Sequence, residues 1–445
     1  MSDIEYLKSL DAVRERAHLV LGAAEKNELL HFAYDASKMS DVADFVEGVI
    51  SRDFGPSAYD QIPPHGRWQH FEVGDVPRIT QLISRWEGQG WDPLEVTRRL
   101  IDLFFVAVLL DAGAGDVWKF TERALGGTGL GTGRGQAYGR SEGIAVAALY
   151  MFRAGAFASR VGADAGDVGG EVVDGHALMA LDTAIFEKHF QITRENLLVG
   201  AASRVELLKR VGKSLLDHPE YFGQYGRPGH LVDYLVQQAG PEKQLDFTML
   251  WGILQETLLP AWPSNRTRIA NVPIGDAWPL QILSKINPSS TSASQTQHIA
   301  PFHKLTQWLA YSLTVPFMRV LGMHWKNLEK GTGLPEYRNG GLFVDLGVLS
   351  LKAEALKTGL ASSGSDLPSF EATSDVIVEW RAMTVALLDK LHGLIGERFA
   401  KQGVTLSMPQ MLEAGSWKAG RELAAKFRPE TKSSPILIDG DGTLF

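Results

Sequence analysis

Helical periodicity is the feature that most constrains how this chain can fold. In residues 374–403, "SDVIVEWRAMTVALLDKLHGLIGERFAKQG", large side chains recur at spacings of three and four, which places them on one side of an α-helix. Ile377, Trp380, Leu387 and Leu391 belong to this stripe, and Gly403 follows it as a stop signal. The stretch predicts a long amphipathic helix.

Three further stretches predict helices. In residues 92–115, Asp92 is a plausible N-cap, Pro93 suits the first turn and Gly113 suits the end. The middle of this stretch is apolar on every side, which predicts a buried helix. Residues 203–222 and 302–322 also have helical patterns, and Pro316 should end or kink the second of them.

Strand signals are sparse. The best are "GGLFVDLGVLSL" (340–351) and "PILI" (435–438), and no alternation of strands with helices is visible. We therefore predict a mainly α fold with a few short strands. Residues 1–445 form either a single α-rich unit or two lobes, of about 1–165 and 166–445.

Composition excludes several classes of protein. The chain contains no cysteine, which excludes disulfides, Cys-ligated zinc and a thiol nucleophile. The net charge is −8 and no Lys/Arg cluster stands out, so we expect no nucleic-acid partner. The most apolar run, 103–110, is too short to cross a bilayer. Charges throughout the first 16 residues argue against a signal peptide, and we expect a cytoplasmic protein without a membrane partner.

Two motif-like segments do not carry a site. The glycine-rich segment 125–136 lacks the spacing of a nucleotide loop. The terminal "SPILIDGDGTLF" looks like a phosphatase nucleophile strand, but only four residues follow Asp441. We expect the last strand to dock into the fold, with Asp439 or Asp441 capping a helix or lining the rim of a pocket.

Polar and aromatic residues concentrate in a few short segments outside the obvious helix faces. The plainest is "LPEYRNGG" (334–341), a turn bounded by Pro and Gly that carries a carboxylate. The ordinary alternative for each segment is a loop ion pair, a half-buried tryptophan or a capping glutamate. The candidate residues are Arg67, Trp68, His70, Phe71, Asp111, Trp118, Arg140, Glu142, His303, Lys304, Gln307, Glu336, Tyr337, Arg338 and Asn339.

The same segments resemble a known family. "RWQHFEVGDVPR", "VLLDAGAGDVWKF", "RSEGIAVAAL", "PFHKLTQWLAYSL" and "LPEYRNGGLFVDLGVL" are similar to the URC uracil-catabolism family of fungi and bacteria, along nearly the whole chain. The resemblance implies a pathway in which uracil becomes a ribotide, its ring is opened, and urea is released from a ribosylurea species. Cleavage of that N-glycosidic bond is the activity that we expect here.

A fainter resemblance concerns the queuosine-salvage nucleoside hydrolases, which are α-helical and related in fold to DNA glycosylases. Lys304, Gln307, Tyr337 and Arg338 match their motifs in order. Glu336 takes the place of the active-site Asp. Ser312 stands where a second acid is expected. This resemblance implies a DNA-glycosylase-like helical architecture and a substrate different from theirs.

Cleavage of a C1′–N bond builds positive charge on the ribose, and Glu336 is our candidate for the carboxylate that stabilises it. His303 and His70 are the candidate general acids, with Glu142 third. No cofactor and no metal are expected, and the partner is a small ribosyl or ribotide substrate. Binding of the sugar hydroxyls or of a 5′-phosphate is expected from Arg67, Arg140, Lys304 and Arg338. The wall of the pocket is expected to consist of Trp68, Phe71 and Trp118. Further substrate contacts are expected from Asp111, Gln307, Tyr337 and Asn339.

Two other functions stay open. The chain is a non-catalytic metabolite-binding or regulatory protein of the uracil pathway, an alternative that the missing second acid favours. Or it is a metal-dependent hydrolase that uses His65, His70 or His303 with nearby acids.

Overall fold

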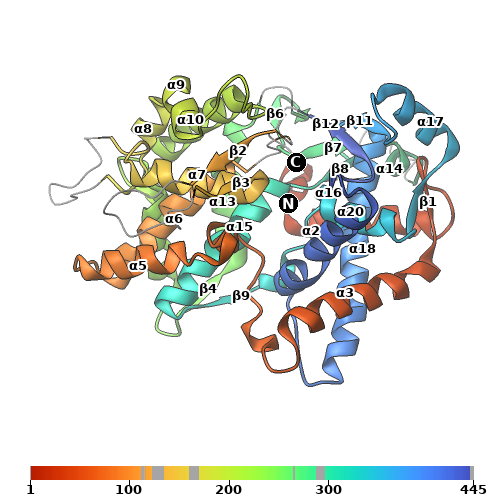
Figure 1. The fold of residues 1–445 in the computed structure, drawn as a ribbon, viewed down its shortest axis with the longest axis horizontal. Coiled ribbons are helices and arrows are strands. Elements are labelled where there is room, and N and C mark those ends of the chain that lie inside the picture. The colour runs from red at the N-terminus through yellow and green to blue at the C-terminus, as the bar shows by residue number, and fades with distance from the viewer. Residues whose placement is uncertain are drawn as a thin grey trace. The chain divides into compact units, whose positions relative to one another are not determined.

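The computed structural model describes residues 2–111, 115, 117–122, 135–159, 170–263, 266–286 and 296–440. Helices dominate it (Figure 1), and in these residues the strands pair only two at a time. The predicted mainly α fold with a few short strands is thus confirmed. The DNA-glycosylase-like architecture stays a prediction.

The chain forms two compact units whose segments alternate along the sequence. Unit 1 comprises Met1–His65, Ser264–Lys304 and Glu329–Gly440, and unit 2 comprises Gly66–Pro263, Leu305–Leu328 and Asp441–Phe445. This division differs from the two consecutive lobes, 1–165 and 166–445, considered from the sequence.

The core of unit 1 surrounds the helix α18 (Asp375–Ala400), which confirms the strongest helix prediction. Every residue from Val376 to Leu388 is buried, and only the second half of the helix alternates buried with exposed positions. The prediction of an amphipathic helix with one apolar stripe is therefore wrong for the first half, because neighbouring helices cover that half on all sides. These neighbours are α2 (Leu10–Ala24), α3 (Met39–Phe54) and α16 (Tyr337–Asp345), beside α18 in Figure 1.

The strand predicted over 340–351 is mostly wrong. Its first half belongs to α16, and only β10 (Leu349–Leu351) is a strand, antiparallel to β1 (Phe32–Tyr34). Glu336 caps the helix and so starts it before the apolar run. Gly340 then lets α16 approach α18 closely, since a Cβ there would lie 2.8 Å from Cε2 of Trp380.

The remaining strands of unit 1 hold distant segments together. β12 (Leu437–Asp439) pairs in parallel with β11 (Ser369–Glu371), which confirms that the last strand docks. The side chain of Asp439 is exposed, whereas Asp441 lies outside the described residues. β7 (Ala277–Pro279) pairs with β8 (Ile299–Pro301), and β5 (Arg268–Ile269) with β6 (Val272–Pro273).

Unit 2 is built around α6 (Pro93–Leu109), which is buried along nearly its whole length, as predicted. Asp92 caps it by accepting a hydrogen bond from the backbone N–H of Glu95 at 2.8 Å. The predicted stop, Gly113, lies outside the described residues. α6 packs against α5 (Arg78–Gly88), α7 (Arg140–Arg153), α10 (Ala201–Asp217) and α12 (Leu231–Ala239).

Prolines affect two helices of unit 2 differently. The helix predicted over 203–222 divides into α10 and α11 (Pro219–Phe222). By contrast, α15 (Lys304–Leu321) continues through Pro316. This proline therefore does not end the helix, and the alternative that it kinks the helix stays a prediction. The cost there is one backbone hydrogen bond, since Pro316 has no N–H for the carbonyl of Ser312.

Short strand pairs complete unit 2. β2 (Lys119–Thr121) pairs with β3 (Ala137–Gly139), and β4 (Gln244–Asp246) pairs in parallel with β9 (His324–Lys326). Within the ranges given above, none of the helices combines the length and the hydropathy that a membrane crossing requires.

Candidate functional site

The residues predicted from the sequence fall into two groups, one in each unit, and we describe each group by itself. The group in unit 1 consists of His303, Lys304, Glu336, Tyr337, Arg338 and Asn339. The group in unit 2 consists of Arg67, Trp68, His70, Phe71, Asp111, Trp118, Arg140, Glu142 and Gln307.

Glu336 is a buried carboxylate, 8% exposed, at the N-cap of α16. Its Oε2 accepts the N–H of Arg338 at 2.7 Å, and its Oε1 accepts the N–H of Asn339 at 2.5 Å. Burial raises the pKa of Glu336, and these two N–H groups and the charges of Lys304 and Arg338 oppose the rise. The carboxyl group is thus held in one orientation and is harder to ionise than an ordinary glutamate.

The residues after Glu336 brace the start of α16. Asn339 donates to the carbonyl of Leu334 at 3.1 Å and accepts from Oγ of Ser416 at 2.8 Å. Arg338 donates to the carbonyl of Lys432 at 2.9 Å, and its guanidinium lies 4.8 Å from the centre of the Tyr337 ring. Asn339 and Arg338 therefore fix the turn that carries Glu336.

Asp276 and Arg381 are two buried residues of unit 1 that the sequence analysis missed. Nη1 and Nη2 of Arg381 donate to the two carboxylate oxygens of Asp276, each at 2.7 Å. Asp276 also accepts the indole N–H of Trp278 at 2.8 Å and the backbone N–H of Lys304 at 3.0 Å. The carboxylate accepts all four of these hydrogen bonds, so its role is to hold Arg381 and the segments at Trp278 and Lys304 together inside unit 1.

A signal for this pair was present in the sequence. Arg381 and Glu379 interrupt an apolar helical run, and a charge inside such a run must be paired when it is buried. Glu379 accepts the backbone N–H groups of Leu30, His31 and Phe32 at 2.8–3.1 Å. The partners of these charges are distant in sequence, so the pattern indicates pairing without naming the partner.

His303 is 1% exposed and has an unusual backbone conformation, with φ at 45°. Its Nε2 lies 2.8 Å from the carbonyl oxygen of Leu7, and a carbonyl only accepts, so Nε2 carries the proton. Burial lowers the pKa of His303. The neutral ring therefore uses its one proton on Leu7, which favours a positioning role over that of a general acid.

The group in unit 2 is centred on Arg67, whose side chain is completely buried. Arg67 immediately precedes the short helix α4 (Trp68–Phe71). Nη1 of Arg67 donates to Oδ2 of Asp111 at 2.7 Å and lies 3.3 Å from Nδ1 of His70. Burial lowers the pKa of Arg67, and the charges of Asp111 and Glu142 oppose this shift.

His70 is buried as well, and its contact with Arg67 fixes its tautomer. A guanidinium only donates, so Nδ1 of His70 accepts and Nε2 carries the proton of the neutral ring. The ring lies 5.7 Å from that of Trp308. Ser312 also meets Arg67, whose backbone N–H donates to the serine Oγ at 3.1 Å.

The predicted aromatic residues line the core of unit 2. Trp68 and Phe71 pack against Phe104 with ring centres 5.9 and 5.2 Å apart. Trp118 stacks on Phe190 and donates its indole N–H to the carbonyl of that residue at 2.8 Å. Gln307 is buried on α15, whereas Arg140 and Glu142 are half-buried at the start of α7.

The histidines proposed as metal ligands have other neighbours. Nδ1 of His65 lies 2.5 Å from Oε2 of Glu413 in unit 1. Among the residues that the structure describes, no three His, Asp or Glu side chains are grouped in a way that could hold a metal ion.

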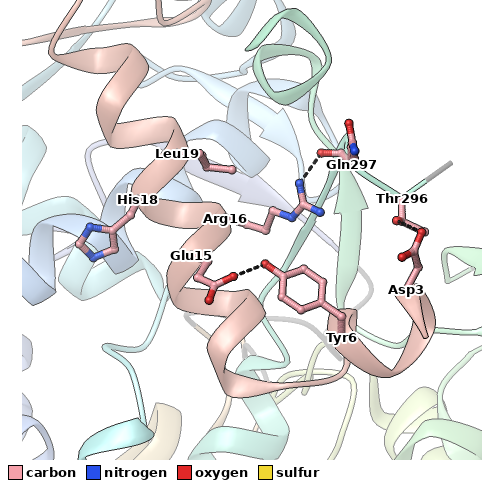
Figure 2. Close-up of a pocket in the computed structure, with 8 residues that line it drawn as sticks. All are labelled: Asp3, Tyr6, Glu15, Arg16, His18, Leu19, Thr296 and Gln297. Atoms are coloured by element: carbon pink, nitrogen blue, oxygen red, sulfur yellow. Dashed lines mark hydrogen bonds between the residues drawn. The ribbon is translucent and has the colours of Figure 1, made fainter. Parts of the chain in front are cut away.

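A surface pocket of about 720 Å³ lies in unit 1 (Figure 2). Tyr6 donates to Glu15 at 2.5 Å, and burial, followed by this hydrogen bond, raises the pKa of Tyr6 to about 12. Nη1 of Arg16 donates to the carbonyl of Gln297 at 2.7 Å. None of the predicted site residues belongs to the lining, which consists of Asp3, Tyr6, Glu15, Arg16, His18, Leu19, Thr296 and Gln297.

Comparison with known proteins identifies the family. A family model described as "Protein of unknown function (DUF1688)" matches residues 6–445, and the chain belongs to this family. Protein urg3 of Schizosaccharomyces pombe is 47% identical over 440 residues, which cover 99% of this chain and 98% of that protein. Uracil catabolism protein 4 of Lachancea kluyveri is 43% identical over 455 residues, which cover 99% of both. The resemblance to the URC uracil-catabolism family is thereby confirmed.

Proposed function

We propose that this protein acts in uracil catabolism as an N-ribosyl hydrolase that releases urea from a ribosylurea-type intermediate. Support for the pathway comes from a relative that is 43% identical over 99% of its length and is named a uracil catabolism protein. Support for the reaction comes from the chemistry that Glu336 offers.

The carrying observation is the buried carboxylate of Glu336, held by two backbone N–H groups and under the influence of the Lys304 charge. When the C1′–N bond breaks, the ribose gains positive charge, and a fixed carboxylate stabilises this charge or deprotonates the attacking water. The oxygen of water bonds to C1′ and the departing nitrogen takes a proton, so the products are urea and the free sugar.

The departing urea nitrogen needs a proton donor, because its anion is a poor leaving group. The Nε2–H of His303 is engaged with the carbonyl of Leu7, which counts against His303 as the general acid. His70 and Glu142 stay candidates for that role.

The test is urea release by the purified protein from ribosylurea and from its 5′-phosphate. Glu336→Gln should lower the rate by roughly 100-fold or more, since it removes the charge that only the transition state needs. Glu379→Gln is the matched control, because Glu379 is also a buried carboxylate of unit 1 that accepts backbone N–H groups. It should cost stability but leave the rate intact. Wild-type protein that binds these compounds without turnover would contradict the hydrolase.

One observation favours the second candidate, a non-catalytic metabolite-binding protein of the same pathway. Both oxygens of Glu336 are engaged in capping α16. The resemblance to the queuosine-salvage hydrolases, which puts Ser312 where a second acid is expected, points the same way. In that case Glu336→Gln would still support growth on uracil as sole nitrogen source. A hydrolase predicts no growth with this variant at normal protein abundance.

A further inference from the structure

The guanidinium of Arg67 has one edge without a partner. Nη1 is occupied by Asp111 and His70, but Nε and Nη2 have no hydrogen-bond acceptor among the residues that the structure describes. The side chain is completely buried. Buried N–H groups, and charged ones above all, are nearly always hydrogen-bonded, so this edge requires an explanation.

Arg78 of the same unit shows how such an edge is normally occupied. Its Nε donates to Oε1 of Glu122 at 2.8 Å and its Nη2 donates to Oε2 at 2.6 Å. Both side chains are completely buried. These are the same two nitrogens that lack an acceptor in Arg67, and together they form the parallel pair of donors that grips a carboxylate or phosphate through two oxygens.

We propose that the Nε–Nη2 edge of Arg67 is a binding site for the carboxylate group of a small metabolite. This inference goes beyond the hydrolase proposal and does not depend on it. Nothing in the argument requires turnover, only that a ligand presents two oxygens to the edge as Glu122 does to Arg78.

The surrounding charges favour a carboxylate over a doubly charged phosphate. Asp111 is bonded to Arg67, its charge also acts on the buried Arg204, and the charge of Glu142 acts on Arg67. Two guanidinium groups are thus already matched by two carboxylates. An incoming single negative charge is opposed by Asp111 and Glu142 less than a double charge would be.

The Nε–H resonance of Arg67 in ¹⁵N-labelled protein reports on this edge directly. It is assigned as the arginine signal lost in Arg67→Lys, and it should shift on titration with acetate but not with chloride at equal ionic strength. Lysine keeps the charge without the paired donors, so Arg67→Lys should weaken acetate binding, measured by isothermal titration calorimetry, by at least about tenfold. Arg98→Lys is the matched control, since the same edge of Arg98 is occupied by Asp233, and its acetate binding should equal that of the wild type.

A second variant keeps the test decisive if Arg67→Lys does not fold. Asp111→Asn removes a competing negative charge and should tighten acetate binding several-fold, an effect that a purely structural arginine would not give. The proposal is overturned if acetate leaves the Arg67 resonance unmoved, or if Asp111→Asn leaves the affinity unchanged. Stronger binding of phosphate than of acetate would overturn the assignment to a carboxylate.

Discussion

Arg381 donates two hydrogen bonds of 2.7 Å to the carboxylate of Asp276, although the two residues are 105 positions apart in sequence. The pair connects the long helix α18 with the segment before β7 inside unit 1. Because Asp276 also accepts the N–H of Lys304, it fixes the point at which α15 begins. A single buried carboxylate thus holds three segments of unit 1.

We predict that Asp276→Asn lowers the free energy of unfolding by about 3–5 kcal/mol at pH 7, because it leaves Arg381 buried without a counter-charge. Urea denaturation measures this. Glu25→Gln is the control, since Glu25 is exposed and its partner Lys390 is only half-buried, and it should cost less than about 1 kcal/mol. Equal effects of the two variants would contradict the prediction.

The same pair sets part of the acid stability. Burial opposes ionisation of Asp276, but Arg381 outweighs burial and holds the pKa of Asp276 well below its usual range. The stabilisation is complete above the unfolded-state pKa of about 3.9 and is lost as the pH falls through the lowered folded-state pKa. Asp276→Asn should therefore show a shallower loss of stability below about pH 4 than the wild type in a series of urea denaturations.

Urea release should depend on pH through Glu336. Burial raises the pKa of Glu336, and the proposed role needs the ionised form. The rate should therefore fall as the pH drops through a value above the usual glutamate pKa of about 4.3. A profile of kcat/KM against pH checks this, and a rate that stays flat down to about pH 4 would count against Glu336 as the reacting carboxylate.

His303 should be dispensable for proton donation but not for stability. His303→Gln keeps a donor that can reach the carbonyl of Leu7, so urea release should stay within roughly threefold of the wild-type rate, whereas His70→Gln should lose about 100-fold or more. The reverse ranking would restore His303 as the general acid.

The lowered pKa of His303 makes a separate prediction about stability. Below the unfolded-state pKa of about 6.5, the unfolded chain takes up a proton that the buried neutral ring does not. The free energy of unfolding therefore decreases as the pH is lowered. Unfolding free energies at pH 7.5 and 5.5 should therefore differ less in His303→Gln than in the wild type. An unchanged difference would show that another group is responsible.

Removal of residues 435–445 should destabilise unit 1. The deletion removes β12, which pairs with β11, and Ile436, which is 1% exposed. Burial of one such side chain contributes about 1.5–3 kcal/mol, and the loss of three paired residues adds to this. Thermal unfolding measures the effect, and a truncated chain with an unchanged Tm would show that β12 does not contribute to stability.

Local signals in the sequence were sufficient for much of the helical structure. The N-cap at Asp92, the apolar run behind it and the stripe from Ile377 to Leu391 predicted α6 and α18. Such signals succeed because capping and periodicity act over a few neighbouring residues. The strand predicted over 340–351 failed because the cap at Glu336 and the packing of Gly340 on Trp380 outweighed the β preference of the apolar run.

Sequence patterns and family resemblance were enough to predict the fold class, the family and candidate residues such as Glu336 and Arg67. The contacts of these residues became known only from the folded structure: Glu336 accepts two backbone N–H groups, His303 donates to Leu7, and Arg67 donates to Asp111. The pairing of Asp276 with Arg381 likewise became known only from the folded structure. The physical reason is that burial and charge pairing depend on contacts between segments far apart in the chain, which no local pattern encodes.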